Sequence, residues 1–147
     1  MMDALALKLC DIQGCLFELS VGEGMDSENF IQVFMNSAVA EGLDSTYNRM
    51  QWAGEEYLLE ELDATCDIAR TENIYARDVM YWIGYQYRYW SILRKISSKK
   101  IVKQAPAKTM NRNYLLFHTM DPEMAVEDLE EIYKQKQNGK CAKVVAE

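Results

Sequence analysis

Proline and histidine are scarce in this chain, which has two prolines and a single histidine among its 147 residues. The four cysteines, Cys10, Cys15, Cys66 and Cys141, show no CxxC spacing. Structural zinc sites need four cysteine or histidine ligands at short, regular spacings. The sequence therefore predicts no metal site and no cofactor, and the cysteines are interpreted as the reduced thiols of a cytoplasmic protein.

Long apolar runs are also missing. No stretch of about 18 apolar residues occurs, whereas a membrane-spanning helix needs about 20. The first fifteen residues, MMDALALKLCDIQGC, are interrupted by Asp3, Lys8 and Asp11 and lack the basic start of a signal peptide. We therefore expect a cytoplasmic protein that does not engage a membrane.

Motifs of catalysis are absent as well. No serine or cysteine lies in a GxSxG-type turn, and the VGEG string at residues 21–24 lacks the GK[ST] of a phosphate-binding loop. The acid pairs Glu55-Glu56 and Glu60-Glu61 are followed by no histidine at the Glu-x-x-His spacing of di-metal bundles. These acids are interpreted as a solvated helix face. His118 is interpreted as a packing or capping residue. The chain is therefore expected to have no enzymatic activity.

Aromatic residues, in contrast, are concentrated in one segment. Seven of the sixteen lie between Tyr75 and Trp90. At 100° per residue of a helix, one side carries Val79, Ile83, Tyr87 and Trp90. The other side carries Tyr81, Trp82, Tyr85, Tyr89 and Leu93. Only Gly84, Arg88 and Ser91 remain, in a narrow polar gap.

A helix that is apolar nearly all round is either the central helix of a bundle or has a face that binds a partner protein, and the sequence leaves both open. Ile83 and Trp90 are predicted to lie in the core, and Arg88 at an accessible edge. The candidate partner-binding residues are Tyr81, Tyr85, Arg88, Tyr89 and His118.

Apolar spacing and helix-capping residues predict an all-α, single-domain helical bundle of about six to seven helices. The expected helices are residues 3–20, 27–41, 49–66, 76–95, a short basic helix from 97 to just before Pro106, 106–118 and 122–137. No run alternates with period two, so no sheet is expected. The domain is predicted to span residues 1–137, and Asn138-Gly139 to end the last helix before a flexible tail, 138–147.

The charges are unevenly distributed along this chain of net charge −7. Residues 1–93 hold sixteen acids and five bases, whereas residues 94–120 hold seven bases and no acid. Such a basic segment binds phosphate or an acidic partner, or pairs with the acidic body of its own fold, or is solvated. The candidate nucleic-acid-binding residues are Lys99, Lys100, Lys103, Lys108 and Arg112.

Three strings carry a family resemblance: MQWAGEEYLLEEL at 50–62, VMYWIGYQYRYW at 79–90, and the stretch 103–133. Over residues 25–137 the chain resembles a family of small, uncharacterised bacterial helical proteins. Residues 83–132 are also similar to a shorter family encoded beside ADP-ribosyltransferase-like toxins. The resemblance implies an antitoxin or accessory partner. This chain departs from those relatives after the aromatic helix, where SILRKISS at 91–98 contains no glycine turn.

The expected function is therefore that of a protein-binding module, in the form of a neutralising, antitoxin-like partner that occludes a bacterial toxin. In the alternative, the chain is a nucleic-acid-associated regulator, or an anti-CRISPR-like inhibitor that is carried by a mobile element and acts on a nucleoprotein complex. Neither the partner nor the oligomeric state follows from the sequence.

Overall fold

Helices form almost all of the secondary structure in this chain. The computed structural model describes residues 2–45 and 52–146, with side chains to residue 139. Within these ranges lie α1 (Ala4–Gly22), α2 (Ser27–Met35), α3 (Ala38–Asp44), α4 (Glu55–Thr65), α5 (Arg77–Arg94), α6 (Ser98–Gln104), α7 (Ala107–Phe117) and α8 (Pro122–Ala146). The described residues contain no strand, only an isolated antiparallel bridge between Met25 and Arg70. The all-α, single-domain prediction is confirmed, with eight helices in the described ranges rather than six or seven.

The additional helix arises because the segment predicted as one helix, 27–41, is broken at Ser37. The Ser37 hydroxyl donates to the carbonyl oxygen of Phe34 at 2.6 Å and accepts from the amide of Ala40 at 3.2 Å. One serine thus ends α2 and caps α3. Gly42, which follows the predicted end of the helix at residue 41, lies inside α3.

Helix α4 begins later than predicted. The start expected at residue 49 lies outside the described residues, and Gly54, with extended backbone, is the residue that precedes the first turn of α4. Trp52 lies within the predicted range 49–66, but it precedes α4 and is 78% exposed. The predicted range is therefore wrong at Trp52, because the helix begins only after Gly54. Leu58 and Leu62 of α4 are buried.

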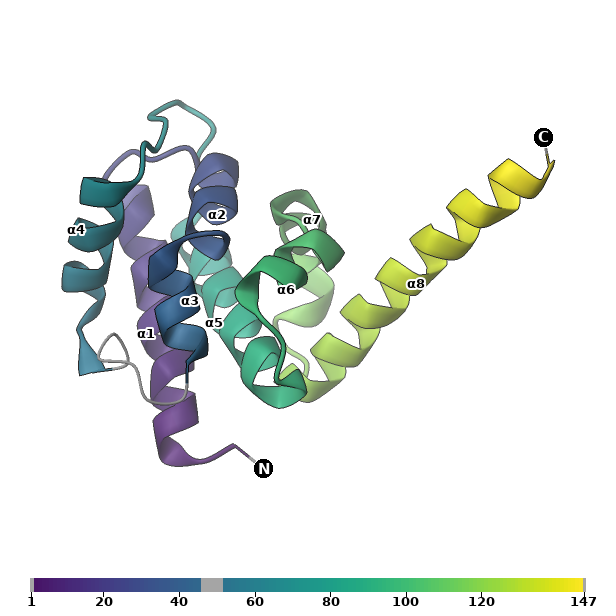
Figure 1. Cartoon of the computed structure of the whole chain (residues 1–147), viewed down its shortest axis with the longest axis horizontal. Helices are drawn as coiled ribbons and strands as arrows, with labels where there is room; N and C mark the ends of the chain where they lie inside the picture. Colours follow the sequence, from purple (N-terminus) through teal and green to yellow (C-terminus); the bar gives the residue numbers. More distant parts are fainter. Residues whose placement is uncertain (1, 46–51, 147) are drawn as a thin grey trace.

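The last helix starts as predicted and ends later. The amide of Glu123 donates to the Asp121 carboxylate at 2.9 Å, and Pro122 occupies the first turn. The predicted stop at Asn138-Gly139 is wrong, because α8 continues to Ala146 and extends away from the other helices (Figure 1). A glycine inside a helix costs only about 1 kcal/mol relative to alanine, so it weakens a helix without having to end it. None of the described helices is long and apolar enough to cross a membrane.

Helix α5 is the central element. It packs against α1, α6, α7 and α8, and Figure 1 shows it passing behind α3 beside α1. Ile83, Tyr87 and Trp90 are fully buried, which confirms the core prediction for Ile83 and Trp90. From the α1 side, Phe17 packs edge-on against Phe30 and Phe34 of α2. The aromatic helix is therefore mainly a core helix.

The turn after α5 has the left-handed geometry that a glycine usually supplies. Lys95 ends α5 with φ 56° and ψ 46°, and it is the one non-glycine residue with positive φ in the described ranges. Its amide donates to the carbonyl oxygen of Ser91. SILRKISS therefore makes a left-handed helix end without glycine, and Ser97 then caps α6 by accepting from the amide of Lys100 at 3.3 Å.

Helices α1 and α5 approach each other closely at Gly84. A Cβ atom there would lie 2.6 Å from the Gln13 carbonyl oxygen and 2.8 Å from Cγ of Phe17. Gly84→Ala should lower the free energy of unfolding by about 1–3 kcal/mol, because overpacking against backbone outweighs the gain in helix propensity. Urea denaturation measures this change. Gly139→Ala is the control, since a Cβ atom there meets nothing within 4 Å. An unchanged Gly84→Ala midpoint would show that the two helices are farther apart.

Candidate partner-binding surface

The predicted nucleic-acid-binding residues lie on two consecutive helices, α6 and α7, here called the basic helix pair. Ile101, Val102 and Met110 are buried, and this orientation turns the intervening basic side chains outward. The exposed basic residues are Lys99, Lys100, Lys103, Lys108 and Arg112. Both helices begin as the sequence indicates, at Ser97 and after Pro106.

The cations of the basic helix pair form no ion pair with an acid among the described residues. In the part of the chain that the structure describes, the ion pairs are Arg70–Asp63, Arg88–Asp44 and Arg94–Glu130. None of the five cations of the pair takes part in them. Of the segment 94–120, Arg94 therefore pairs with an acid of its own fold, as one of the open interpretations expected. The five cations of the basic helix pair are exposed to solvent or to a partner.

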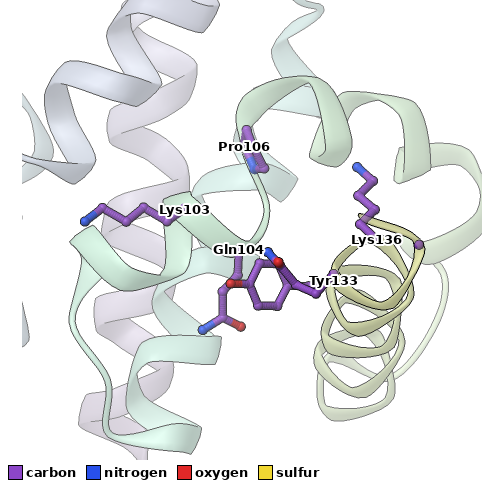
Figure 2. Close-up of a pocket in the computed structure, with 7 residues that line it drawn as sticks. Lys103, Gln104, Pro106, Tyr133 and Lys136 are labelled. Atoms are coloured by element: carbon purple, nitrogen blue, oxygen red, sulfur yellow. The ribbon is translucent and has the colours of Figure 1, made fainter. Parts of the chain in front are cut away.

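A hollow of about 410 Å³ separates the link between α6 and α7 from α8 (Figure 2). In Figure 2, Tyr133 of α8 lies next to Gln104, while the amino groups of Lys103 and Lys136 point away from each other. Lys136 donates to the Thr109 hydroxyl at 3.3 Å. Because the two cations do not converge on one point, the hollow lacks the geometry of a small-anion site. The basic helix pair is better suited to contact a broad surface.

Three predicted contact tyrosines form a row on one side of α5. The ring centroids of Tyr81 and Tyr85 are 6.1 Å apart, and those of Tyr85 and Tyr89 are 6.5 Å apart. All three are half-buried, and the Tyr81 hydroxyl donates to the Asp11 carboxylate. Burial raises the pKa of Tyr89, and the nearby carboxylates of Asp121 and Glu123 raise it further. These neutral phenols have exposed edges, and their role in partner binding stays a prediction.

Arg88 is not at an accessible edge, and that prediction is wrong. Its side chain is 1% exposed. Its Nε donates to Gln13 at 2.8 Å, Nη1 to Asp44 at 2.6 Å and Nη2 to Ser98 at 3.2 Å. Burial lowers the pKa of Arg88, and the Asp44 carboxylate opposes that shift. Arg88 therefore joins α1, α3, α5 and α6, and its guanidinium is not exposed on the surface.

The burial of Arg88 could have been predicted from the narrowness of the polar gap on the aromatic helix. Three residues on a helix that is otherwise covered all round leave little room for water. A buried guanidinium then needs a carboxylate and several acceptors. The sequence indicates this need but does not identify Asp44 as the partner.

His118 acts as the sequence indicates, at the end of a helix. It is the C-terminal cap of α7, and its Nδ1 lies 2.7 Å from the Tyr114 carbonyl oxygen. Its ring stacks on that of Tyr114 with 4.2 Å between centroids. The packing or capping interpretation is confirmed. Its exposed ring edge leaves the predicted partner contact open.

The acids of α4 do not assemble a metal site. Glu56 and Glu60 are exposed, and Glu55 and Glu61 are half-buried. The described residues contain no group of three or more histidine, cysteine or acidic side chains that could hold a metal ion. The acidic pairs therefore form a mostly solvated face, as predicted.

Two leucines on α7 were missed at the sequence level. Leu115 is 80% exposed and Leu116 is 71% exposed. They could have been recognised from helical periodicity, because Leu115 and Leu116 fall outside the stripe that contains the buried residues Met110 and Phe117. They place a small apolar patch beside Arg112.

Comparison with known proteins identifies no match to a family model, to a curated protein or to a solved structure. The family resemblance of the three strings has no support from these comparisons. What the chain binds must therefore be inferred from its own surface.

Proposed function

We propose that this chain is a cytoplasmic, non-enzymatic protein-binding module whose basic helix pair contacts an acidic surface of a partner protein. The observation that carries the proposal is the clustering on two consecutive helices of five exposed cations that form no ion pair among the described residues. Charge complementarity to an acidic surface would increase both the association rate and the specificity.

The surrounding charge makes this arrangement informative. The chain carries net charge −7, yet its 27-residue segment 94–120 has no acid. Within this segment Arg94 does form an ion pair, because its guanidinium donates to the Glu130 carboxylate at 2.9 Å. The five cations of the basic helix pair form no such ion pair among the described residues. Clustered cations repel one another, and an acidic partner would relieve that repulsion.

In its more specific form, the proposal is that the partner is a bacterial toxin and that binding occludes it. This form depends on the resemblance of residues 83–132 to proteins encoded beside ADP-ribosyltransferase-like toxins. Co-expression with the gene next to this one in its native host tests it. The chain should restore growth if that gene encodes a toxin, and failure to restore growth with a toxic neighbour would remove the specific form only.

The second candidate is a nucleic-acid-associated regulator or a mobile-element inhibitor of a nucleoprotein complex. The observation that favours it is the spacing of Lys99 and Lys103 on α6, and of Lys108 and Arg112 on α7, which aligns cations one turn apart. The sixteen acids of residues 1–93 oppose it, because their field repels a polyanion.

Replacing the basic side chains separates these two candidates. The variant changes four residues to glutamine: Lys99, Lys100, Lys103 and Arg112. Capture of a protein partner from the native host should fall at least about tenfold, a loss of 1.4 kcal/mol or more. Stability should change by no more than about 0.5 kcal/mol because the side chains are exposed. The parent should bind duplex DNA no tighter than about 10⁻⁴ M at physiological salt.

A control variant removes the same number of positive charges outside the basic helix pair. It changes four exposed residues to glutamine: Lys8, Arg77, Lys95 and Lys134. It should capture the partner as the parent does. Equal loss in both variants would mean that only net charge matters. Submicromolar DNA or RNA binding by the isolated parent, lost in the first variant, would replace the protein-binding proposal with the regulator.

A further inference from the structure

Helix α7 carries a stripe of exposed side chains opposite its buried face. At 3.6 residues per turn, Lys108, Arg112 and Leu115 fall within roughly 60° of the helix circumference. Asn111 and Leu116 border them. All five side chains are exposed, and this set is called the α7 stripe. Its exposure means that the described residues leave that side of α7 open.

The α7 stripe is divided along its length. Its first half has two cations, Lys108 and Arg112, one turn apart and without an ion pair in the described residues. Its second half has Leu115 and Leu116, exposed by 80% and 71%. An apolar pair next to unpaired cations combines the two features of a protein contact: apolar area to remove from water and charge to set the orientation.

We propose that the α7 stripe binds one acidic amphipathic helix of a partner protein, an inference that rests on the proposed function and specifies its partner. The partner's carboxylates face Lys108 and Arg112, and its apolar side chains pack on Leu115 and Leu116. From Lys108 to Leu116 the stripe is about 12 Å long, which matches two to three turns of a second helix. An open helix face accepts such a partner by interlocking side-chain ridges.

Two other occupants fit the α7 stripe less well. A second copy of this chain carries its own net charge of −7, so two copies repel each other. Nucleic acid would use the two cations but gain nothing from two leucines beside them, because phosphate contacts are polar. An acidic amphipathic helix would place carboxylates near the two cations and would bury the apolar area of the two leucines.

The probe that tests this inference is a stapled helical peptide of about four turns, held helical to reduce the cost of ordering. One face carries glutamates on the first two turns and leucines on the last two. A matched peptide of the same composition interleaves glutamate and leucine. Fluorescence anisotropy with the full chain should show the segregated peptide binding at least about tenfold tighter than the interleaved one.

Two variants separate the halves of the stripe. Leu115→Asn with Leu116→Asn should weaken the segregated peptide about tenfold or more and leave its salt dependence unchanged. Lys108→Gln with Arg112→Gln should weaken binding and flatten the salt dependence. Both pairs are exposed, so the fold is retained. The control, Lys8→Gln with Arg77→Gln, should bind the peptide as the parent does.

Three results would overturn the inference. The first is a failed peptide test, seen either as binding of the segregated peptide no tighter than about 1 mM or as equal binding by the leucine variant. The second is self-association of the parent, seen by sedimentation and lost in the leucine variant, which would assign the stripe to a second copy. The third is DNA binding that needs Lys108 and Arg112 but neither leucine.

The proposed function and the helix-binding inference can be disproved by different results. If the peptide does not bind while capture of the native partner still depends on Lys99, Lys100 and Lys103, the protein-binding proposal stands and the helix inference falls. If capture is independent of the basic helix pair, the proposed function falls whatever the peptide does.

Discussion

Replacing Arg88 with methionine should lower the free energy of unfolding by about 3–5 kcal/mol, the usual cost of breaking a buried ion pair by removing one partner. The Arg88 guanidinium is buried and bonded to Asp44, Gln13 and Ser98. Without it, the Gln13 oxygen loses its donor. The Asp44 carboxylate keeps its hydrogen bonds from Ser98 and Ser91 but has no cation beside it. At 2–4 °C per kcal/mol, the melting temperature should fall by roughly 10 °C.

Asp44→Asn in the Arg88→Met background provides the control, because it removes the carboxylate that was left unpaired. This double variant should be more stable than Arg88→Met alone, whereas Asp44→Asn by itself should be destabilising since it leaves a buried cation unpaired. Thermal and urea unfolding followed by circular dichroism measure both. A stability of Arg88→Met equal to that of the parent would contradict the buried network.

Trp90→Ala should be comparably destabilising, by about 3–5 kcal/mol, through loss of apolar contacts and formation of a cavity. The Trp90 side chain is fully buried in the face of α5 that also carries Ile83 and Tyr87. Its Nε1 is buried without a hydrogen-bond acceptor among the described residues. The ring therefore contributes through packing alone.

Trp90→Phe is the matched substitution for this site. It keeps an aromatic ring and removes the unpaired N–H, so it should cost clearly less than Trp90→Ala. Urea denaturation of the two variants gives the comparison. Equal stability of Trp90→Ala and the parent would show that the ring lies outside the core, and equal losses in both variants would point to an unrecognised acceptor for Nε1.

Helix positions were largely predictable because apolar periodicity and caps are local properties. The aromatic helix was expected at 76–95 and spans Arg77–Arg94, and α6 lies between Ser97 and Pro106 as predicted. Ile83 and Trp90 are in the core for the same reason: both belong to one stripe that is covered on folding.

The predicted helix boundaries were wrong where the residues at a boundary are compatible both with a helix end and with a continuing helix. Ser37 can be read as a helix interior residue or as a cap, and in the fold it is a cap. Asn138-Gly139 reads as a stop, yet α8 passes through it. In both places the intrinsic preference is about 1 kcal/mol, so the surrounding structure determines the outcome.

The sequence by itself determined that the chain is helical and that basic residues cluster in residues 94–120. Both follow from the order of residues alone. Only the tertiary structure decided which of the charges face solvent. Arg88 is buried because folding brings it to Asp44, 44 residues away in the chain. Lys108 and Arg112 remain exposed because Met110 and Phe117, on the opposite side of α7, are the residues that pack into the core. Burial of a charge depends on the partner that folding supplies, and that partner is a nonlocal property.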